Sequence, residues 1–186
     1  SFAYVAWSPD SKYFALVRSD ERKVSKLWIV NNLAEPRPTL ETYTYAMPGD
    51  TAMPQAHLLL FDMTDKTHRE IDASAYKDQT LNIQTKPYPE SARDDDYTPV
   101  IWSGNNNHFY VTRQDRPMKR IDVLDVDIHS PKAKSIIQER MNTSMEAQDV
   151  GVIDGGKELI EWSERSGWAQ FYLYKVLTRP KKVYHS

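Results

Sequence analysis

The sequence of 186 residues contains no cysteine, which excludes thiol catalysis, disulfide bonds and cysteine-ligated zinc. Its apolar runs are all far shorter than the roughly 20 residues of a membrane-spanning helix. Neither sign of charge predominates, since the formal net charge is −2. Because nucleic acids and anionic membranes attract basic surfaces, this balance gives no argument for either as a partner.

Recognisable catalytic motifs are also missing. None of the six glycines lies in a Gly-x-Ser-x-Gly arrangement, the turn that exposes the nucleophile of many serine hydrolases. The five histidines include no His-x-x-x-His pair of the kind that binds zinc. A triad of separated serine, histidine and aspartate residues stays open, but no pattern locates one. We therefore expect no catalytic residue, metal site or cofactor in the chain.

Three polar motifs have a more ordinary interpretation. The acidic run 94–96 could bind a hard cation through its carboxylates, but a solvated loop is the expectation that we favour. Asp122, Asp125 and Asp127 lie along one expected strand and are likewise predicted to face solvent. The run Asn142-Thr-Ser144 fits the glycosylation sequon, a pattern that is common by chance.

What the sequence does contain favours β structure. Eleven tyrosines and five tryptophans make it rich in aromatics, and its eleven prolines are scattered, which breaks long helices and separates short strands. The clearest element spans residues 157–174, where two apolar runs flank the polar connection Ser163–Gly167. A short turn with glycine between such runs predicts an antiparallel hairpin.

Further strands are expected along the whole chain. A meander of three strands is predicted at 2–7, 13–17 and 26–30. An edge strand is expected at 40–46, and a central strand at 56–62. The other expected strands are 66–72, 81–84, 99–102, 108–112, 120–127 and 134–138, and 139–150 is expected to be a loop or a single turn.

Two segments repeat without a gap. Trp7-Ser-Pro-Asp-Ser-Lys-Tyr-Phe-Ala-Leu-Val-Arg18 aligns with Trp102-Ser-Gly-Asn-Asn-Asn-His-Phe-Tyr-Val-Thr-Arg113 at an offset of 95 residues. A third copy begins at Asp154 and places Lys157 against Lys12, so it follows the second copy by 50 residues. A period near 50 residues with about four strands in each repeat is typical of a β-propeller. A generic antiparallel sandwich is the simplest alternative.

The spacing divides the chain into repeat units of about 1–98, 99–150 and 151–186 within a single propeller domain. Because residues 31–98 carry few turn-and-strand units, we expect one enlarged blade there rather than two. The predicted fold is therefore all-β, a partial β-propeller of about three to four blades, each an antiparallel four-stranded sheet.

These motifs resemble the N-terminal propeller of dipeptidyl peptidase IV-like enzymes, which belong to the prolyl oligopeptidase class of serine peptidases. The most specific match is Trp162-Ser-Glu-Arg-Ser-Gly-Trp168 followed by Phe171-Tyr-Leu-Tyr174, and Trp7-Ser-Pro-Asp and Trp102-Ser agree with it. The run Arg37–Gly49, followed by 58–62, is similar to the segment that precedes a blade strand in such enzymes. The likeness is greatest to bacterial members.

The resemblance implies a propeller of seven or eight blades that covers an α/β-hydrolase domain. Peptide substrate would bind between the two and lose dipeptides from its free N-terminus. The hydrolase domain is expected beyond Ser186, and the glutamates that hold the substrate's amino group before Ser1. No catalytic residue is therefore carried over, the substrate-binding residues stay unknown, and the chain alone is expected to lack peptidase activity. An exported bacterial location, periplasmic or at the cell surface, is also implied.

The residues of the repeat motifs are expected to be structural: Trp7, Trp102, Trp162, Glu164, Arg165, Gly167 and Trp168. We predict that Glu164 and Arg165 hold neighbouring blades together rather than act in catalysis. Trp162 and Trp168 are predicted to pack between blades rather than to line a peptide chamber. In relatives an aromatic residue commonly follows the equivalent of Asn142-Thr143, and Ser144-Met145 stands there instead, so no substrate-wall role is predicted for it.

Two other functions stay open. One is a stand-alone propeller module that binds a protein or peptide, and the other is a carbohydrate-binding surface domain with exposed tryptophans. The partners expected in the longer protein are peptide substrate and the hydrolase domain. Because free strand edges pair readily, the isolated chain is also expected to self-associate through exposed blade edges.

Overall fold

Strands predominate in the part of the chain that the structure describes. The computed structural model describes residues 5–84, 107–147, 150–154 and 157–175, and contains no α-helix within them. It follows that no membrane-crossing helix is found among these residues. The strands are β1 (Ala6–Trp7), β2 (Tyr13–Asp20), β3 (Lys26–Asn31), β4 (Thr39–Thr44), β5 (Gln55–Asp62), β6 (Thr67–Ile71), β7 (Thr80–Ile83), β8 (His108–Gln114), β9 (Arg120–Asp127), β10 (Lys134–Arg140), β11 (Gly151–Ile153), β12 (Glu158–Ser163) and β13 (Gln170–Lys175).

The first sheet is four-stranded and antiparallel, in the order β1-β2-β5-β6. The predicted meander is wrong in its third strand, because β3 pairs with β4 and β5 takes the place beside β2. The pairing of β2 with β5 extends from Tyr13↔Asp62 to Asp20↔Gln55 and places Leu58 and Leu60 in the core. Burying these leucines favours β5 as the neighbour of β2.

The second sheet is also four-stranded and antiparallel, in the order β7-β8-β9-β10. Its strand β7 lies within the first expected repeat unit, 1–98, so that this unit contributes strands to two sheets. The third sheet has the described strands β11, β12 and β13, and the pairing of β12 with β13 confirms the hairpin predicted at 157–174. The expected strand 99–102 lies outside the described residues.

The predicted repeat reappears in the positions of the strands. Strands β2, β8 and β12 are each the second strand of a sheet, and they begin at residues 13, 108 and 158. These starts are separated by the same 95 and 50 residues as the sequence motifs. The third strands β9 and β13 begin at 120 and 170, again 50 residues apart. The sheets are thus copies of one unit, and together they form a partial β-propeller.

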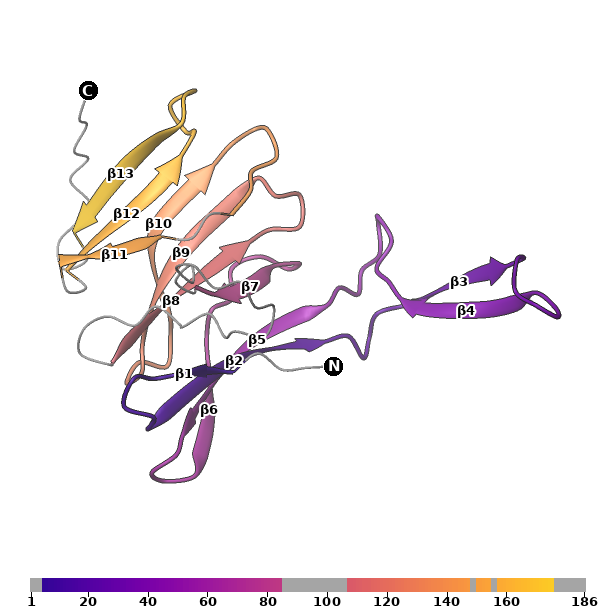
Figure 1. Ribbon diagram of the computed structural model, residues 1–186, viewed down its shortest axis with the longest axis horizontal. Helices are drawn as coiled ribbons and strands as arrows, with labels where there is room; N and C mark the ends of the chain where they lie inside the picture. The colour runs from indigo at the N-terminus through magenta and orange to yellow at the C-terminus, as the bar shows by residue number, and fades with distance from the viewer. Residues whose placement is uncertain (1–4, 85–106, 148–149, 155–156, 176–186) are drawn as a thin grey trace.

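The three sheets lie side by side in chain order (Figure 1). Each carries apolar side chains on the face that meets its neighbour. We call the contact between the first and second sheets the first junction, and that between the second and third sheets the second junction. The first junction is filled by Ala15, Leu58, Leu60, Phe109, Val111, Leu124 and Val126, among others. The second junction has a smaller buried core of Tyr110, Val123, Ile137, Val150 and Leu159. Alternating strand residues thus serve the two junctions of the middle sheet.

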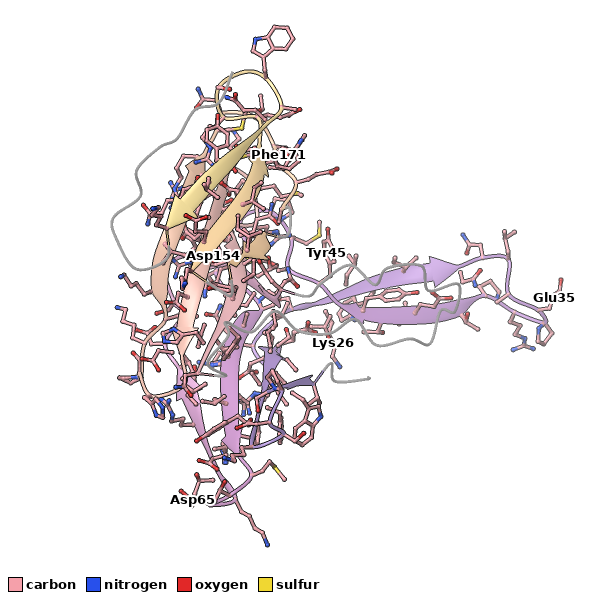
Figure 2. All side chains as sticks on the ribbon, turned by 60° about the vertical axis from the view of Figure 1, so that its left-hand side comes forward. Lys26, Glu35, Tyr45, Asp65, Asp154 and Phe171 are labelled. Atoms are coloured by element: carbon pink, nitrogen blue, oxygen red, sulfur yellow. The ribbon has the colours of Figure 1, made fainter. Side chains whose placement is uncertain are left out.

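The hairpin of β3 and β4, which we call the arm, projects from the first sheet (Figures 1 and 2). It is inserted between β2 and β5 and forms a two-stranded sheet of its own. Trp28 is 69% exposed and Leu40 is 63% exposed, so the arm buries little apolar surface. At its base, Arg116 of the β8–β9 turn donates a hydrogen bond of 2.6 Å to the carbonyl of Ala46.

Candidate functional site

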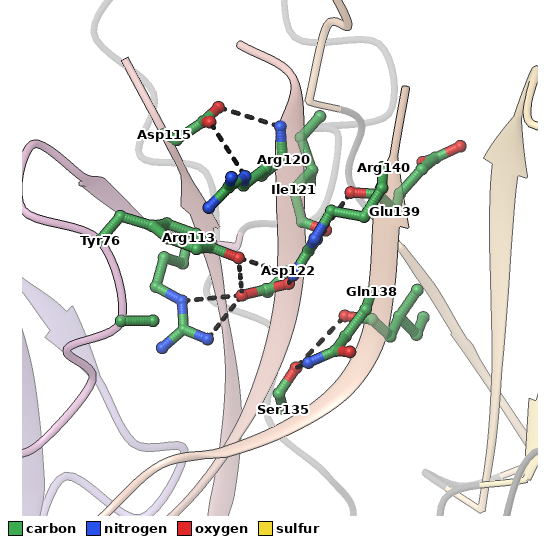
Figure 3. Close-up of polar contacts among 12 residues, drawn as sticks. Tyr76, Arg113, Asp115, Arg120, Ile121, Asp122, Ser135, Gln138, Glu139 and Arg140 are labelled. Atoms are coloured by element: carbon green, nitrogen blue, oxygen red, sulfur yellow. Dashed lines mark hydrogen bonds and ion pairs between the residues drawn. The ribbon is translucent and has the colours of Figure 1, made fainter. Parts of the chain in front are cut away.

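A buried carboxylate organises the polar side chains of the first junction (Figure 3). Asp122 of β9 has no exposed surface, and its Oδ2 accepts hydrogen bonds of 2.9 Å from Nε of Arg113 and 2.9 Å from the hydroxyl of Tyr76. Its Oδ1 accepts a bond of 2.6 Å from Nη2 of Arg140 on β10. Charge-assisted bonds of this kind are about twice as strong as neutral ones. Asp122 therefore ties β8, β9, β10 and the 72–79 loop together.

The two arginines are themselves fixed by backbone oxygens. Nη1 of Arg113 donates a bond of 2.8 Å to the carbonyl of Ala73, which lies in the connection from the first sheet to the second. Nη1 of Arg140 donates to the carbonyl of Ile121 at 3.1 Å. Burial raises the pKa of Asp122, but the bonds from Arg113, Arg140 and Tyr76 outweigh this effect and hold the pKa below its ordinary value. The group is an ionised structural anchor rather than an acid or base.

Asp122 was predicted to face solvent, and this prediction is wrong. The strand places Asp122 on the face that carries Leu124 and Val126, which pack in the first junction. The burial can be tolerated because two guanidinium groups and a hydroxyl satisfy the carboxylate. The sequence contained one indication of this burial, because Asp122 lies within the apolar run Ile121-Asp-Val-Leu124. A strand face that is exposed to solvent does not need apolar residues on both sides of the aspartate. Nothing in the sequence around Tyr76 indicated that its hydroxyl would contact Asp122.

The second junction holds a different polar cluster, built around Arg165. Its guanidinium pairs with Glu161 of β12, and its Nε lies 3.7 Å from Oε1 of Glu139 on β10 in the neighbouring sheet. The hydroxyl of Tyr174 on β13 donates a bond of 2.9 Å to Glu161. Ser163 donates to Glu139 and so adds a second link between the sheets. Burial raises the pKa of Glu161 above its ordinary value, although Arg165 and Tyr174 act in the opposite direction.

The remaining motif residues lie on the surface. Glu164 is exposed, and its carbonyl accepts a bond of 2.8 Å from the amide of Gly167. Gly167 has a φ of 93°, a left-handed conformation that favours glycine in this turn. Trp168 is 82% exposed, so the predicted packing of this ring between blades is not made by the described residues. Trp102 lies outside the described residues, as does the acidic run 94–96.

Aromatic side chains also line the outer face of the first sheet, away from the first junction. Trp7, Phe14, Phe61 and His68 lie in register on four adjacent strands. The rings of Phe14 and Phe61 are stacked, with centroids 4.5 Å apart and an interplanar angle of 7°. Trp7 lies against the other side of Phe14 at a centroid distance of 4.9 Å, and His68 stacks on Phe61 at 5.2 Å. The two phenylalanines therefore present mainly ring edges to a neighbouring surface.

The outer face of the third sheet resembles this strip. Trp162 and Phe171 are register partners, and so are Ile160 and Leu173. All four lie on the opposite face of the sheet from Leu159, which is buried in the second junction. Phe171 is 68% exposed, so both outermost faces of the stack present aromatic surface.

A cavity of about 370 Å³ lies beside the first junction, where the 72–79 loop meets β5 and β6. Its lining includes Tyr76, His57 and Glu70, and Nδ1 of His57 lies 2.7 Å from Oε1 of Glu70. Among the residues that the structure describes, no three histidine or acidic side chains converge on a point where a metal ion could bind.

Comparison with known proteins agrees with the repeated sheets. The sequence model of a family described as the dipeptidyl peptidase IV (DPP IV) N-terminal region matches residues 1–185. The chain belongs to this family. No curated protein matches the chain.

Solved structures agree with this N-terminal region in fold. The dipeptidyl peptidase 4 of Porphyromonas gingivalis has a TM-score of 0.72 and 20% sequence identity, and the match covers 98% of this chain and 24% of that one. A Bacteroides ovatus protein described as a dipeptidyl aminopeptidase IV has a TM-score of 0.69 and 16% identity, over 94% of this chain and 23% of that one. The N-terminal region described here thus spans about a quarter of the length of these proteins.

Proposed function

We propose that this DPP IV N-terminal region is the non-catalytic propeller segment of a bacterial, exported serine exopeptidase that releases N-terminal dipeptides. Its sheets would form part of the wall of a chamber, admit short peptides and help to position them for a hydrolase domain on another part of the protein. The family match and the likeness to solved dipeptidyl peptidases support this proposal.

One observation about the stack of sheets carries the proposal. Tyr110 and Val123 on the middle sheet are covered by the third sheet, and the residues 50 positions later are Ile160 and Leu173 on the outer face of that sheet. The repeat therefore continues a face that is buried inside the stack onto a face that no described residue covers. A further sheet of the same kind, supplied by a longer protein, is the partner that such a surface fits.

The two alternative functions receive less support. A carbohydrate-binding face offers a group of flat aromatic rings to sugar rings, but Phe14 and Phe61 stack on each other. The exposed Trp28 and Trp168 lie in separate elements, one in the arm and the other in the β12–β13 turn. A stand-alone binding module would be expected to close its ends, whereas Trp7 is 48% exposed on one end face and Phe171 is 68% exposed on the other.

The test compares two proteins made from the same reading frame. The product of the whole reading frame is expected to cleave a chromogenic X-Pro dipeptide substrate, whereas the purified 186-residue chain is expected to leave it intact. Blocking the amino group of the substrate should abolish cleavage, since an exopeptidase requires a free N-terminus. Cleavage by the isolated chain, or no cleavage by the whole product, would refute the proposal.

A further inference from the structure

The two junctions differ in their balance of buried charge. At the first junction, two guanidinium groups, of Arg113 and Arg140, pair with the single carboxylate of Asp122. At the second junction, two carboxylates, of Glu139 and Glu161, share the single guanidinium of Arg165. The cluster around Arg165 therefore has one more negative charge than positive charge when both glutamates are ionised. Asp125 and His108 of the middle sheet face the same junction and pair with each other, with His108 Nδ1 2.8 Å from Asp125 Oδ1.

Both glutamates are well shielded from water. The side chain of Glu139 is 10% exposed and that of Glu161 is 5% exposed. Arg165 lies closer to Glu161 than to Glu139, from which its Nε is 3.7 Å away. Because an unmatched buried charge is costly, a group in this position tends to become neutral.

From this geometry we propose that the second junction is a proton-sensitive latch, in which Glu161, beside Glu139, takes up one proton and so holds the third sheet against the second. The other groups that act on Glu161 are Arg165 on its own turn and Tyr174 on β13.

The direction of the pH dependence follows from the pKa of Glu161 in the folded state. Burial, and the charge of Glu139, raise the pKa of Glu161 above its ordinary value of 4.5. A group whose pKa is raised on folding contributes stability at low pH and loses it as the pH rises through the folded pKa. The latch is therefore closed in mildly acidic solution and weakens toward neutral pH.

The stability of the second junction should respond to the binding of one proton, because its other interactions are limited. Its buried apolar core is small among the described residues. The hydroxyl of Tyr110, which is fully buried there, has no hydrogen-bond partner in the described part of the chain. The net stabilisation of the third sheet is correspondingly modest, so that a single proton changes its attachment measurably.

Hydrogen exchange of the 186-residue chain tests the proposal. Protection of the β12 and β13 amides, corrected for intrinsic exchange, is measured from mildly acidic to neutral pH. In the natural chain protection should fall as the pH rises, by about tenfold for each unit by which the pKa of Glu161 differs between attached and detached states. In Glu161→Gln the pH dependence should disappear, because the amide is neutral throughout.

Two further variants are measured in the same way, one at the second junction and one outside it. Glu139→Gln leaves one carboxylate for one guanidinium and should also flatten the pH profile, which covers the case in which Glu161→Gln does not fold. Asp65→Asn, in an exposed turn of the first sheet, should preserve the pH dependence of β12 and β13. A flat profile in the natural chain, or an unchanged slope in a folded Glu161→Gln or Glu139→Gln variant, would overturn the proposal.

Discussion

Tyr76 donates a hydrogen bond of 2.9 Å to Oδ2 of Asp122, although 46 residues separate the two in the chain. The bond joins the loop that leaves the first sheet to a central strand of the second sheet. Arg140 completes the contact by donating to the same tyrosine hydroxyl at 2.6 Å. The first junction thus depends on polar contacts as well as on its apolar core.

Replacement of Asp122 should be among the most damaging single changes in the chain. Asp122→Ala leaves Arg113 buried without its carboxylate, and breaking a buried pair in this way costs about 3–5 kcal/mol of unfolding free energy. Tyr76→Phe removes two bonds to charged groups, one donated to Asp122 and one accepted from Arg140, and should cost about 1.5–3 kcal/mol. Urea denaturation followed by tryptophan fluorescence measures both values.

The exposed Asp65 provides a matched control for Asp122. Asp65→Ala should change the unfolding free energy by no more than about 0.5 kcal/mol, as is usual for surface positions. If Asp122→Ala were as mild as Asp65→Ala, the polar cluster would contribute nothing to the first junction.

The sequence predicted the positions of the strands better than their pairing. The offsets of 95 and 50 residues between the motifs recur in the starts of β2, β8 and β12, because each motif occupies the turn before a second strand. The pairing of β3 with β4 could not be read locally. Lys26–Asn31 has strand composition, but the choice between β3 and β5 as the neighbour of β2 depends on which one fills the first junction.

The polar clusters were the least predictable feature. Asp122, Asp125 and Asp127 look alike in sequence, yet Asp122 alone among them is fully buried. The difference arises from Arg113, Arg140 and Tyr76, which come from three other segments and meet only in the folded chain. A pattern read along one strand contains no information about such partners.

Removal of the Tyr110 hydroxyl should not destabilise the chain, in contrast to removal of the Asp122 carboxylate. It is buried in the second junction without a partner among the described residues, and burial, together with the charge of Asp125, raises the pKa of Tyr110 to about 12. Removing an unsatisfied buried hydroxyl relieves its desolvation cost, so Tyr110→Phe should keep or raise the unfolding free energy, by up to about 1 kcal/mol.

Tyr174→Phe is the matched comparison for Tyr110→Phe. The hydroxyl of Tyr174 donates to Glu161 and accepts a bond of 2.6 Å from Arg165, so its loss should cost about 1.5–3 kcal/mol. Equal losses in the two phenylalanine variants would show that the Tyr110 hydroxyl has a partner in solution.

The arm should be dispensable for the stability of the sheets. The amide of Tyr45 donates a bond of 3.0 Å to the carbonyl of Ser25, so the ends of the arm are adjacent and an Asn-Gly turn can replace residues 26–44. Because Trp28 and Leu40 remain exposed in the arm, its removal should change the unfolding free energy by less than about 1 kcal/mol.

A substitution in the apolar core provides the unfolding free energy against which the deletion of the arm is compared. Leu58 lies in the first junction and is 1% exposed, so Leu58→Ala should cost about 2–5 kcal/mol under the same conditions. A loss of that size on removal of the arm would mean that the arm packs against the sheets in solution.

Self-association of the isolated chain should involve the outer faces of the stack as well as its strand edges. On the third sheet, Trp162 and Phe171 are register partners, and Phe171 is 68% exposed. Two such faces can bury each other in the way that neighbouring sheets do inside the stack. Light scattering across micromolar concentrations should therefore show an average mass above that of the monomer.

Phe171→Glu should shift the equilibrium toward monomer, because it places a charge in the contact, whereas Met63→Glu, on a turn of the first sheet, should not. A natural chain that stays monomeric throughout this range would contradict the prediction, and an equal response of the two glutamate variants would place the contact elsewhere.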